Sequence, residues 1–600
     1  MFTIQFKTIE FRPDLLITLR TDILGWEKDL PGEYIDDAWK FELDETDFPN
    51  GLSFKFFLEN SYWMSGDNLR LVNPVDGDVY IYENLDFAPI DELVVENGIV
   101  QQMFFQPNLN EDEDYDVIVI GSGMGGGILA DELSDMDLKV LVLEAGSYLF
   151  PTHIANLPRQ HQVGQFDKHV WGLWDEFQTR NYNSAPGSGY NGAQGFNLGG
   201  RSVFWGGLIP KMASYEMDLW AAAVNSQEIK WYLEDSGYQK AENLMNASPI
   251  PPSTYHNQIK GALRRFLPDY NHFDAPVAVQ YSNGNLATIP AGMFSTADLL
   301  MESRLTDSSV GNQNLTINLN HAVTKIETDG NKATGVTAYD LIARKERTYK
   351  GKNVVLAAGT VESAKLAFLS GLNDASDKIG QGMTDHPVFF THFAIPNTSP
   401  FYDSSNNSKI LSQHKLANST PSPHPYNMVL ELGADFNQGR YVDDDILAEH
   451  LKERGNTMLC EIVFLLNAPL KEENNLTQTG SSGVKPLIQM QPNDLPDGLR
   501  EQLEELKDRV INQLGGISLA GGSLALQTAG LGGVAHEVGT LRMNQDANAG
   551  VVDLNLKFHQ YDNLYACDLS VFPTSPAANP SLTLAALAIR LAEHLKSLDD

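Results

Sequence analysis

The residues with the clearest chemical potential are three glycines in the segment GSGMGGG. Gly121, Gly123 and Gly126 have the spacing G-x-G-x-x-G. In that pattern the first glycine permits a tight turn, the second lets the backbone approach a pyrophosphate, and the third lets a helix pack closely on a strand. Glu144 follows Gly126 by 18 residues, where a carboxylate can accept hydrogen bonds from a ribose diol. The spacing predicts a site for an adenine dinucleotide, either FAD or a nicotinamide coenzyme.

The sequence around the glycines predicts the elements that such a site needs. DYDVIVIG (114–121) and KVLVLEAG (139–146) are short apolar runs, typical of strands buried on both faces. A helical stretch with Ile128, Leu129 and Leu133 on one side connects them. This order predicts a βαβ unit that places phosphates over the free amides of the helix start. The alternative is an ordinary tight turn with an exposed glutamate, because 49 glycines make chance matches easy.

The first hundred residues predict a different structure. Residues 1–105 contain short β-rich stretches separated by Gly, Pro, Asn and Asp, which is typical of a small all-β sandwich. Residues 106–114, QPNLNEDED, predict a polar linker. Further on, KNVVLAAGTVESAKLAF (352–368) has the order of a second buried strand, a small-residue turn and a helix.

Composition limits the function classes. Six hundred residues, 42% of them hydrophobic, predict several domains with large cores. The chain has 42 basic and 78 acidic residues, a formal net charge of −36 that would repel nucleic acid and anionic lipid. Two cysteines, Cys460 and Cys567, cannot form a disulfide framework or a cysteine zinc site, so we expect no metal. The sequence shows no signal peptide and no membrane-length apolar run, so we expect a cytoplasmic protein.

Several distant segments together resemble the glucose–methanol–choline (GMC) oxidoreductases, a family of FAD enzymes that act mainly on alcohols and sugars. The resemblance extends from Asp112 to the end of the chain and fits least well between 391 and 530. The segments that carry it are the βαβ unit, NLGGRSVFWGG (197–207), IGQGMTDHP (379–387), AHEVGTLRM (535–543) and the pattern NLYACDLSVFPTSPAANPSLTLAALAIRLAEHL (563–595).

The resemblance implies an α/β FAD-binding domain of Rossmann type and an α+β substrate domain with an antiparallel sheet. The FAD-binding domain is expected to comprise residues 115–215, 310–390 and 531–600. The substrate-binding domain and its connecting segments are expected to comprise residues 216–309 and 391–530.

The resemblance also makes His536 the active-site histidine and Asn579 its partner. Alcohol oxidation needs loss of a hydroxyl proton together with hydride transfer from carbon to the flavin. A histidine is suited to accept that proton near neutral pH, and an amide can orient the alcohol. The alternatives are a structural hydrogen bond for His536 and a helix cap for Asn579, because Asn before Pro580 is typical of a helix start.

The cofactor contacts follow from the same resemblance. In the family, the helix that begins near Pro580 faces the flavin, where its dipole favours negative charge. Some sugar-oxidising members bind the flavin covalently through a histidine, and Phe204 occupies that position here, so we expect non-covalent FAD. The expected cofactor-binding residues are Gly121, Gly123, Gly126, Glu144, Asn197, Gly199, Gly200, Val323, Asp568, Pro580 and Thr583.

For the substrate, the HEVGTLRM and NPSLT contexts resemble the sugar- and polyol-oxidising branch. The amino-terminal residues resemble starch-binding carbohydrate modules, with Trp26 and Trp63 as candidates for stacking on sugar rings and Trp39 as a core residue. In the alternative, all three tryptophans pack inside the sandwich. The expected function is FAD-dependent oxidation of a sugar, polyol or related alcohol. A lyase of the same fold, a non-sugar alcohol or sterol oxidase, and a glycan-binding scaffold with an inactive flavin core are the alternatives.

Overall fold

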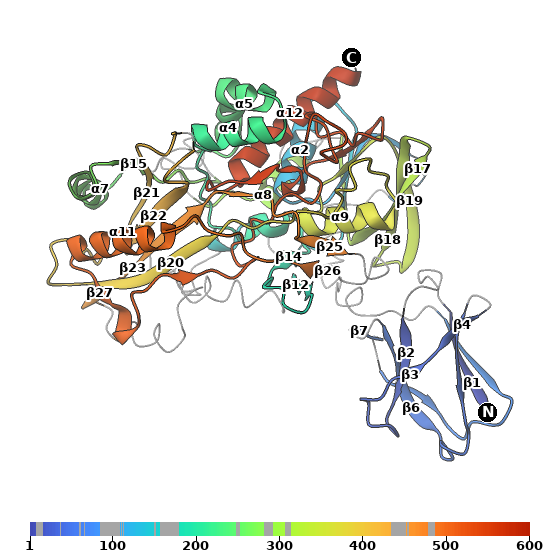
Figure 1. The fold of residues 1–600 in the computed structure, drawn as a ribbon. Helices are drawn as coiled ribbons and strands as arrows, with labels where there is room; N and C mark the ends of the chain where they lie inside the picture. The colour runs from blue at the N-terminus through green and yellow to red at the C-terminus, as the bar shows by residue number, and fades with distance from the viewer. Residues whose placement is uncertain are drawn as a thin grey trace.

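The computed structural model of this chain contains four main sheets with their helices (Figure 1). The described residues are 1–7, 16–35, 38–58, 62–64, 67–83, 109, 111, 113–148, 152–156, 179–247, 252–280, 292–305, 314–419, 421–433, 452, 455–477 and 486–599.

The amino-terminal strands form two sheets around one apolar core. The first has the order β4-β5-β1-β9, and the second has the order β3-β2-β6-β7 with β8 beside β6. Burial alternates along β1, because successive side chains of a strand point to opposite faces. Trp39 lies in the shared core, as expected. The bounds are β1 Phe2–Lys7, β2 Ile17–Thr21, β3 Leu30–Pro31, β4 Glu33–Ile35, β5 Ala38–Leu43, β6 Leu52–Leu58, β7 Tyr62–Trp63, β8 Leu69–Leu71 and β9 Val79–Glu83.

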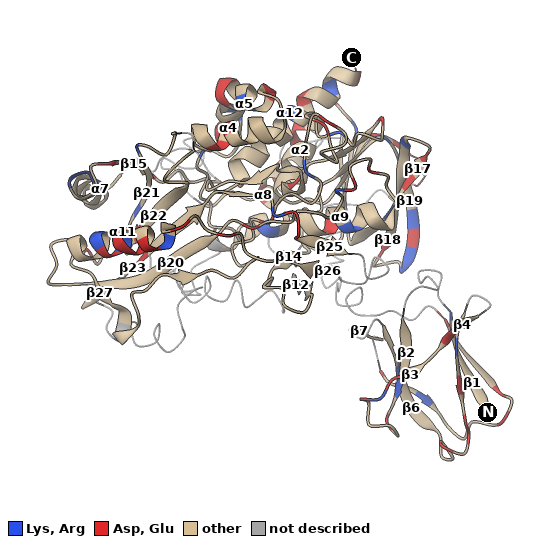
Figure 2. Cartoon of the chain, in the orientation of Figure 1, with Lys and Arg blue, Asp and Glu red and all other residues tan. Residues whose placement is uncertain are grey.

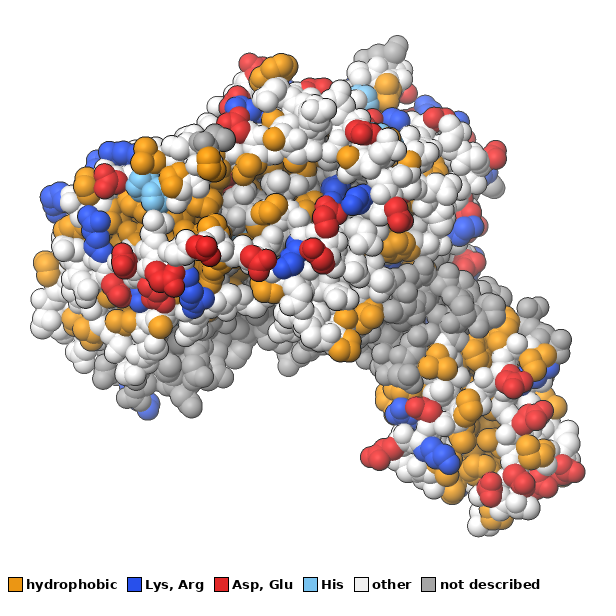
Figure 3. All heavy atoms as spheres, viewed as in Figure 1, with side chains coloured by type: hydrophobic (Ala, Val, Ile, Leu, Met, Phe, Trp, Pro, Cys, Tyr) orange, Lys and Arg blue, Asp and Glu red, His pale blue; other side chains and the backbone are white. Residues whose placement is uncertain are grey.

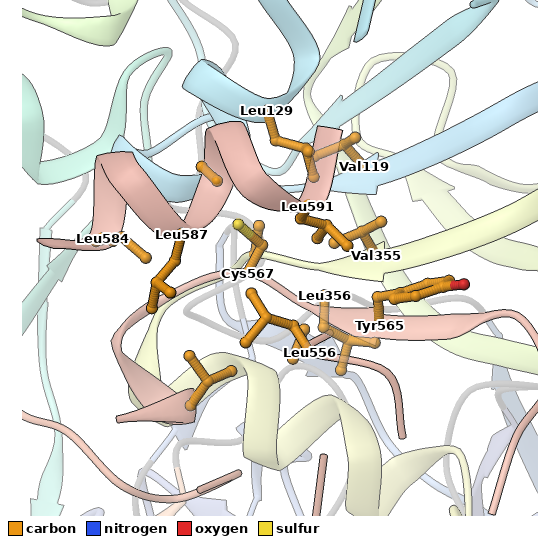
Figure 4. Packing of buried hydrophobic residues seen from close by; sticks show 14 of the residues in the cluster. Val119, Leu129, Val355, Leu356, Leu556, Tyr565, Cys567, Leu584, Leu587 and Leu591 are labelled. Atoms are coloured by element: carbon orange, nitrogen blue, oxygen red, sulfur yellow. The ribbon is translucent and has the colours of Figure 1, made fainter. Parts of the chain in front are cut away.

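The predicted βαβ unit forms the centre of a third sheet, which we call the nucleotide sheet. Its order is β16-β11-β10-β19-β18-β17, with β29 beside β19; β16, β11, β10, β19 and β29 run parallel. Val119 of this sheet packs with Leu129 of α2 and Leu591 of α12 (Figure 4). The bounds are β10 Asp114–Ile120, α2 Met124–Asp135, β11 Val140–Glu144, β16 Leu315–Leu319, β17 His321–Asp329, β18 Lys332–Asp340, β19 Lys345–Leu356, α9 Thr360–Leu369, β29 Leu564–Ala566 and α12 Ser581–Asp599.

The fourth sheet is antiparallel, and we call it the substrate sheet. Its order is β15-β21-β22-β23-β20-β27, with β28 beside β20. One face packs on α7 and α11, and side chains of both helices and of four strands share a core there. The bounds are α7 Thr254–Phe266, β15 Tyr270–Asp274, β20 Val388–Pro396, β21 Ser408–His414, β22 Tyr426–Leu432, β23 Thr457–Leu466, α11 Leu499–Leu514, β27 Ile517–Ser518 and β28 Gln527–Thr528.

The helices between the two large sheets require a correction to the expected domain boundaries. We expected residues 216–309 in the substrate-binding part, but α6 packs against α12, and α8 packs against α2. Tyr238 and Leu300 from these helices enter the core of the nucleotide sheet because that sheet needs a cover on the α2 face. Among the described residues of this range, β15 joins the substrate sheet and α7 packs on it. The helix bounds are α4 Ser214–Ala223, α5 Glu228–Tyr232, α6 Tyr238–Leu244 and α8 Thr296–Leu305.

Short strands and helical turns connect the main elements. Figure 2 shows acidic and basic residues together along α11, and Figure 3 shows acidic groups spread over the visible face. None of the helices in the described ranges combines the length and apolar character needed to cross a membrane. The remaining elements are η2 Ile154–Asn156, β12 Thr179–Asn181, β13 Asn183–Ser184, β14 Ala193–Gly195, η3 Gly200–Val203, η4 Leu233–Gly237, β24 Ala468–Pro469, β25 Asn475–Thr477, β26 Leu487–Gln489, η6 Leu519–Gly521, η7 Leu569–Val571 and β30 Thr574–Ser575.

Candidate active site

One continuous cavity is lined by residues of both large sheets. Gly121 and Gly123 of the glycine turn line it, and so do His536 and Asn579. Val463 contributes from the substrate sheet. The cavity therefore brings the expected nucleotide site and the expected catalytic pair together, although more than 400 residues separate them in the sequence.

The three motif glycines have three different surroundings. Gly121 has a φ of +101°, and an added Cβ there would lie 2.5 Å from the Ala357 carbonyl oxygen. An added Cβ at Gly126 would lie 2.1 Å from the Gly121 oxygen, so this glycine allows helix and strand to pack closely. At Gly123 no atom lies within 4 Å of such a Cβ, because that position faces the cavity. This backbone leaves open space where a pyrophosphate must approach.

Glu144 lines the cavity at the end of β11, and protein groups hold both of its carboxylate oxygens. Oε2 accepts hydrogen bonds from the Ser122 amide at 3.1 Å and the Ser122 hydroxyl at 2.6 Å, and Oε1 accepts one from the Gly146 amide at 2.9 Å. Burial raises the pKa of Glu144 despite these bonds. A carboxylate has about four acceptor positions, so Glu144 retains acceptor capacity for a ribose hydroxyl.

The glycine-rich segment after β14 supports the same wall. Gly200 lines the cavity, whereas Asn197 and Gly199 do not. The Asn197 amide donates to the Leu198 and Gly200 carbonyl oxygens, at 2.9 and 3.2 Å. The Gly199 amide donates to the Ser122 hydroxyl at 2.9 Å. Asn197 and Gly199 therefore shape the loop that presents Gly200.

Of the remaining predicted cofactor residues, three line the cavity and one does not. Val323, Asp568 and Pro580 line the cavity. Asp568 is buried, and its Oδ2 accepts hydrogen bonds from the Gly359 amide at 3.0 Å and from a serine hydroxyl. Thr583 lies outside the cavity lining, and its hydroxyl is 3.0 Å from the Tyr238 hydroxyl. The structure thus gives Thr583 a role in helix packing.

The structure adds a residue that the sequence interpretation did not identify, His386. The Nδ1 atom of His536 lies 2.9 Å from Nε2 of His386, and Nδ1 of His386 lies 2.7 Å from the Pro576 carbonyl oxygen. Because a carbonyl oxygen only accepts, Nδ1 of His386 carries a proton and Nε2 of the neutral ring is an acceptor. Burial lowers the pKa of His386 to about 4, so this ring stays neutral at physiological pH.

The hydrogen bond to His386 fixes the tautomer of His536. Its Nδ1 must donate to His386, so its neutral ring carries the lone pair on Nε2. Ala535, directly before it, has a φ of +61°, an uncommon conformation for a residue with a side chain. The backbone turn and the partner ring together orient the imidazole.

Asn579 lies just before α12, which begins at Ser581. Pro580 occupies the capping position, since its carbonyl accepts the Leu584 amide at 2.9 Å. Asn579 directly precedes this capping position and lines the cavity. Glu216 of α4, a second residue that the sequence did not indicate, holds this segment: its Oε1 accepts the Ala577 and Ala578 amides at 2.5 and 3.2 Å.

A third group that the sequence did not indicate surrounds Glu537, next to His536. Its Oε1 accepts the Tyr190 hydroxyl at 2.8 Å, and its Oε2 accepts the Arg201 guanidinium at 2.9 Å. Glu537 is buried and Arg201 lines the cavity. Glu537 directly follows His536 in the AHEVGT segment. Its partners Tyr190 and Arg201 lie more than 300 residues away in the sequence, so only the fold brings them to it.

The cavity fits FAD in shape and in donor chemistry. The open space at Gly123 suits a pyrophosphate, Glu144 suits a ribose, and the start of α12 suits the negatively charged edge of a flavin. Within the described ranges, the His, Cys, Asp and Glu side chains form no group of three that could hold a metal ion. The open space at Gly123, the carboxylate of Glu144 and the start of α12 would hold an organic dinucleotide.

Comparisons with known proteins show which families and folds this chain resembles. Two family models described as GMC oxidoreductase match residues 287–388 and 504–588. A long-chain-alcohol oxidase of Arabidopsis thaliana is 21% identical over 609 residues, covering 90% of this chain and 77% of that protein. Pyridoxine 4-oxidase of Microbacterium luteolum is 22% identical, covering 79% of this chain and 98% of that protein. A formate oxidase structure from Aspergillus oryzae has a TM-score of 0.58 at 15% identity, covering 82% of this chain and 99% of that one.

Proposed function

We propose that this chain, which belongs to the GMC oxidoreductase family, binds FAD along the glycine turn and oxidises the hydroxyl-bearing carbon of an alcohol. The observation that carries the proposal is the shared cavity of Gly123, His536 and Asn579. The His386 contact adds support, because it leaves the basic nitrogen of His536 as Nε2.

In this proposal the protein holds and deprotonates the alcohol. Nε2 of His536 accepts the hydroxyl proton, and His386 stabilises the imidazolium that forms through the bond at Nδ1. The amide of Asn579 fixes the alcohol oxygen, which orients the carbon–hydrogen bond. When bound, FAD accepts the hydride. The amides at the start of α12 supply a positive dipole at the cavity wall.

The part of the cavity lined by the substrate sheet bears on the substrate. Apolar side chains form much of it, Leu208, Val388, Val429, Val463 and Leu465, and four of these lie on the substrate sheet; Lys409, Glu431 and Glu461 of the same sheet also line the cavity. The sequence favours a sugar or polyol, but a fully hydroxylated ring would lose hydrogen bonds to water against this wall. We therefore place alcohols with an apolar segment first and sugars or polyols second.

Phe204 also lines the cavity and offers no nucleophile, which supports non-covalent FAD. After acid precipitation of the protein, the yellow colour should stay in the supernatant. Yellow pellets would contradict this assignment.

The proposal is tested by anaerobic mixing with panels of straight-chain alcohols, sugars and polyols. We expect the flavin absorption to bleach with the parent enzyme, and His536→Ala and Asn579→Ala to retain FAD but lose most of the reduction rate. Product without bleaching would indicate the lyase alternative. Binding without either would indicate the scaffold, and equal rates in His536→Ala would remove that residue from the base role. Repeating the assay with oxygen, a quinone or neither identifies the electron acceptor.

A second candidate function concerns the amino-terminal sandwich. Trp26 and Trp63 lie beside each other, with ring centroids 6.1 Å apart, and both are half-buried. The Arg20 guanidinium lies 5.3 Å from the Trp63 ring centroid. Paired aromatic rings support a glycan-binding surface. Retardation in gels containing soluble starch should disappear in Trp26→Ala; unretarded parent protein would contradict glycan binding.

A further inference from the structure

Arg201 differs from the two lysines that line the cavity in where its acidic partner lies. Arg201, Lys365 and Lys409 are the basic side chains of the described cavity lining. Lys365 and Lys409 each pair with a glutamate that lines the cavity beside them. Arg201 pairs with Glu537, which lies outside the described lining. This ion pair therefore presents its positive end to the cavity.

The guanidinium of Arg201 has hydrogen-bond donors left for a group in the cavity. An arginine side chain carries several N–H donors and no acceptor, and it stays protonated in proteins. Among the described residues, one of these donors is used, in the bond from Nη1 to Oε2 of Glu537 at 2.9 Å. The Arg201 side chain is 22% exposed and lines the cavity. The other donors can therefore bond to a ligand that occupies the cavity.

Buried groups behind the wall hold this guanidinium in place. Glu537 is buried, and its other carboxylate oxygen accepts the Tyr190 hydroxyl at 2.8 Å. The main-chain oxygen of Glu537 accepts the Thr360 hydroxyl at 2.6 Å. Asp385, which also interacts electrostatically with Arg201, is buried outside the described lining as well. The acidic neighbours of Arg201 thus fix the side chain without occupying the cavity surface.

Arg201 lies between the two ends of the proposed cofactor site. It directly follows Gly200, and an added Cβ at Gly200 would lie 3.3 Å from Cα of Gly123. Its partner Glu537 directly follows His536. Since the pyrophosphate belongs at Gly123 and the reacting end of the cofactor at His536, the wall at Arg201 adjoins the part between them. That part is the flavin half of the cofactor.

The chemistry of reduction gives a positive group at this place a function. Hydride transfer adds one negative charge to the flavin, and a fixed positive charge nearby stabilises the added charge. Hydrogen bonds from an ionised donor are also stronger than those from a neutral one. We propose that Arg201, held by Glu537, binds the flavin half of the cofactor and raises its reduction potential. This inference rests on the proposed function, but the potential is measured without any alcohol.

The experiment measures the midpoint potential of the bound flavin by equilibration with a reference dye, without substrate or oxygen. Arg201→Gln and Arg201→Met should lower the equilibrium constant for reduction about tenfold, which is about 30 mV for a two-electron couple, because one charge-assisted hydrogen bond is lost. Arg201→Lys keeps the positive charge and should stay closer to the parent. The matched control is Arg265→Met, which removes an exposed arginine of α7 outside the cavity lining and should leave the potential unchanged.

Two neutral variants keep the test decisive. The amide of Arg201→Gln can still donate to Glu537, so this variant retains the internal bond if Arg201→Met does not fold. A potential equal to that of the parent in either neutral variant would overturn the inference. A lowered potential in the neutral variants, with Arg201→Lys and Arg265→Met near the parent, would support it. Failure of every alcohol to bleach the parent flavin would overturn the proposed oxidation and leave the measured potentials as they stand.

Discussion

The contact between His386 and His536 makes a prediction that connects a hydrogen bond to a reaction rate. In His386→Leu, Nδ1 of His536 loses its acceptor at 2.9 Å, and the Pro576 carbonyl loses its donor at 2.7 Å. The bond from Nδ1 strengthens when the ring becomes an imidazolium, because hydrogen bonds from charged groups are stronger than neutral ones. Removing it should therefore make His536 a weaker base.

The magnitude follows from the difference between the two kinds of bond. Neutral hydrogen bonds contribute about 1 kcal/mol and charged ones about 2 kcal/mol, so the imidazolium loses about 1 kcal/mol more than the neutral ring. This corresponds to about a fivefold lower rate and to a downward shift of the His536 pKa by about 0.7 pH unit. Because activity needs the neutral ring, the acid limb of the rate profile should move to lower pH while the plateau falls.

The assay is anaerobic stopped-flow reduction of the bound flavin by a saturating alcohol over a range of pH. His386→Gln is the matched control, since its amide oxygen can accept from Nδ1 and should restore part of the plateau and the position of the limb. A merely structural role for His386 would lower the rate without moving the limb. An unchanged plateau and limb in the leucine variant would refute the reasoning.

Three further predictions concern the cofactor, the Asn579 segment and buried charge. Gly123→Val should lose FAD during purification, measured as the flavin-to-protein absorbance ratio, because its side chain would occupy the open space at the glycine turn; full FAD content would contradict that placement. Glu216→Gln should keep FAD but lower the free energy of unfolding in urea by about 1 to 3 kcal/mol, because an amide cannot replace both carboxylate acceptors; unchanged stability would argue against a supporting role. Burial raises the pKa of Asp131 to about 7. The protonated side chain therefore stabilises the folded state fully below its unfolded pKa near 3.8, and this stabilisation is lost as the pH rises toward 7. The free energy of unfolding of Asp131→Asn should therefore rise by about 2 to 3 kcal/mol relative to that of the parent between pH 5 and pH 8, measured by urea titrations. A difference that does not change with pH would show that the pKa of Asp131 is not raised.

The sequence predicted the parts of the fold that depend on local pattern. The runs at 114–121 and 139–146 alternate with a glycine turn and a helix, and the structure forms the same βαβ unit there. The long-range contacts were not predictable in the same way. His386 was visible within TDHP, yet its pairing with His536 spans 150 residues and depends on where β20 begins.

Other differences have the same physical origin. Glu216 lies in the range that we expected in the substrate-binding domain and its connecting segments, and its bond to the segment before Asn579 depends on α4 packing into the core of the nucleotide sheet. Thr583 looked like a cofactor residue because of its motif, but the rotation of α12 directs its hydroxyl to Tyr238. The alignment of Lys409, Glu431 and Glu461 on neighbouring strands could not be seen in the sequence, since strand register, not spacing along the chain, sets it.

The most direct test of the central claim is the single-turnover rate of flavin bleaching by an alcohol deuterated at its hydroxyl-bearing carbon, measured without oxygen. If His536 and Asn579 present that carbon for hydride transfer, the deuterated alcohol should bleach the flavin several times more slowly than the ordinary one. Equal rates would mean that breaking this carbon–hydrogen bond does not limit reduction and would contradict the account.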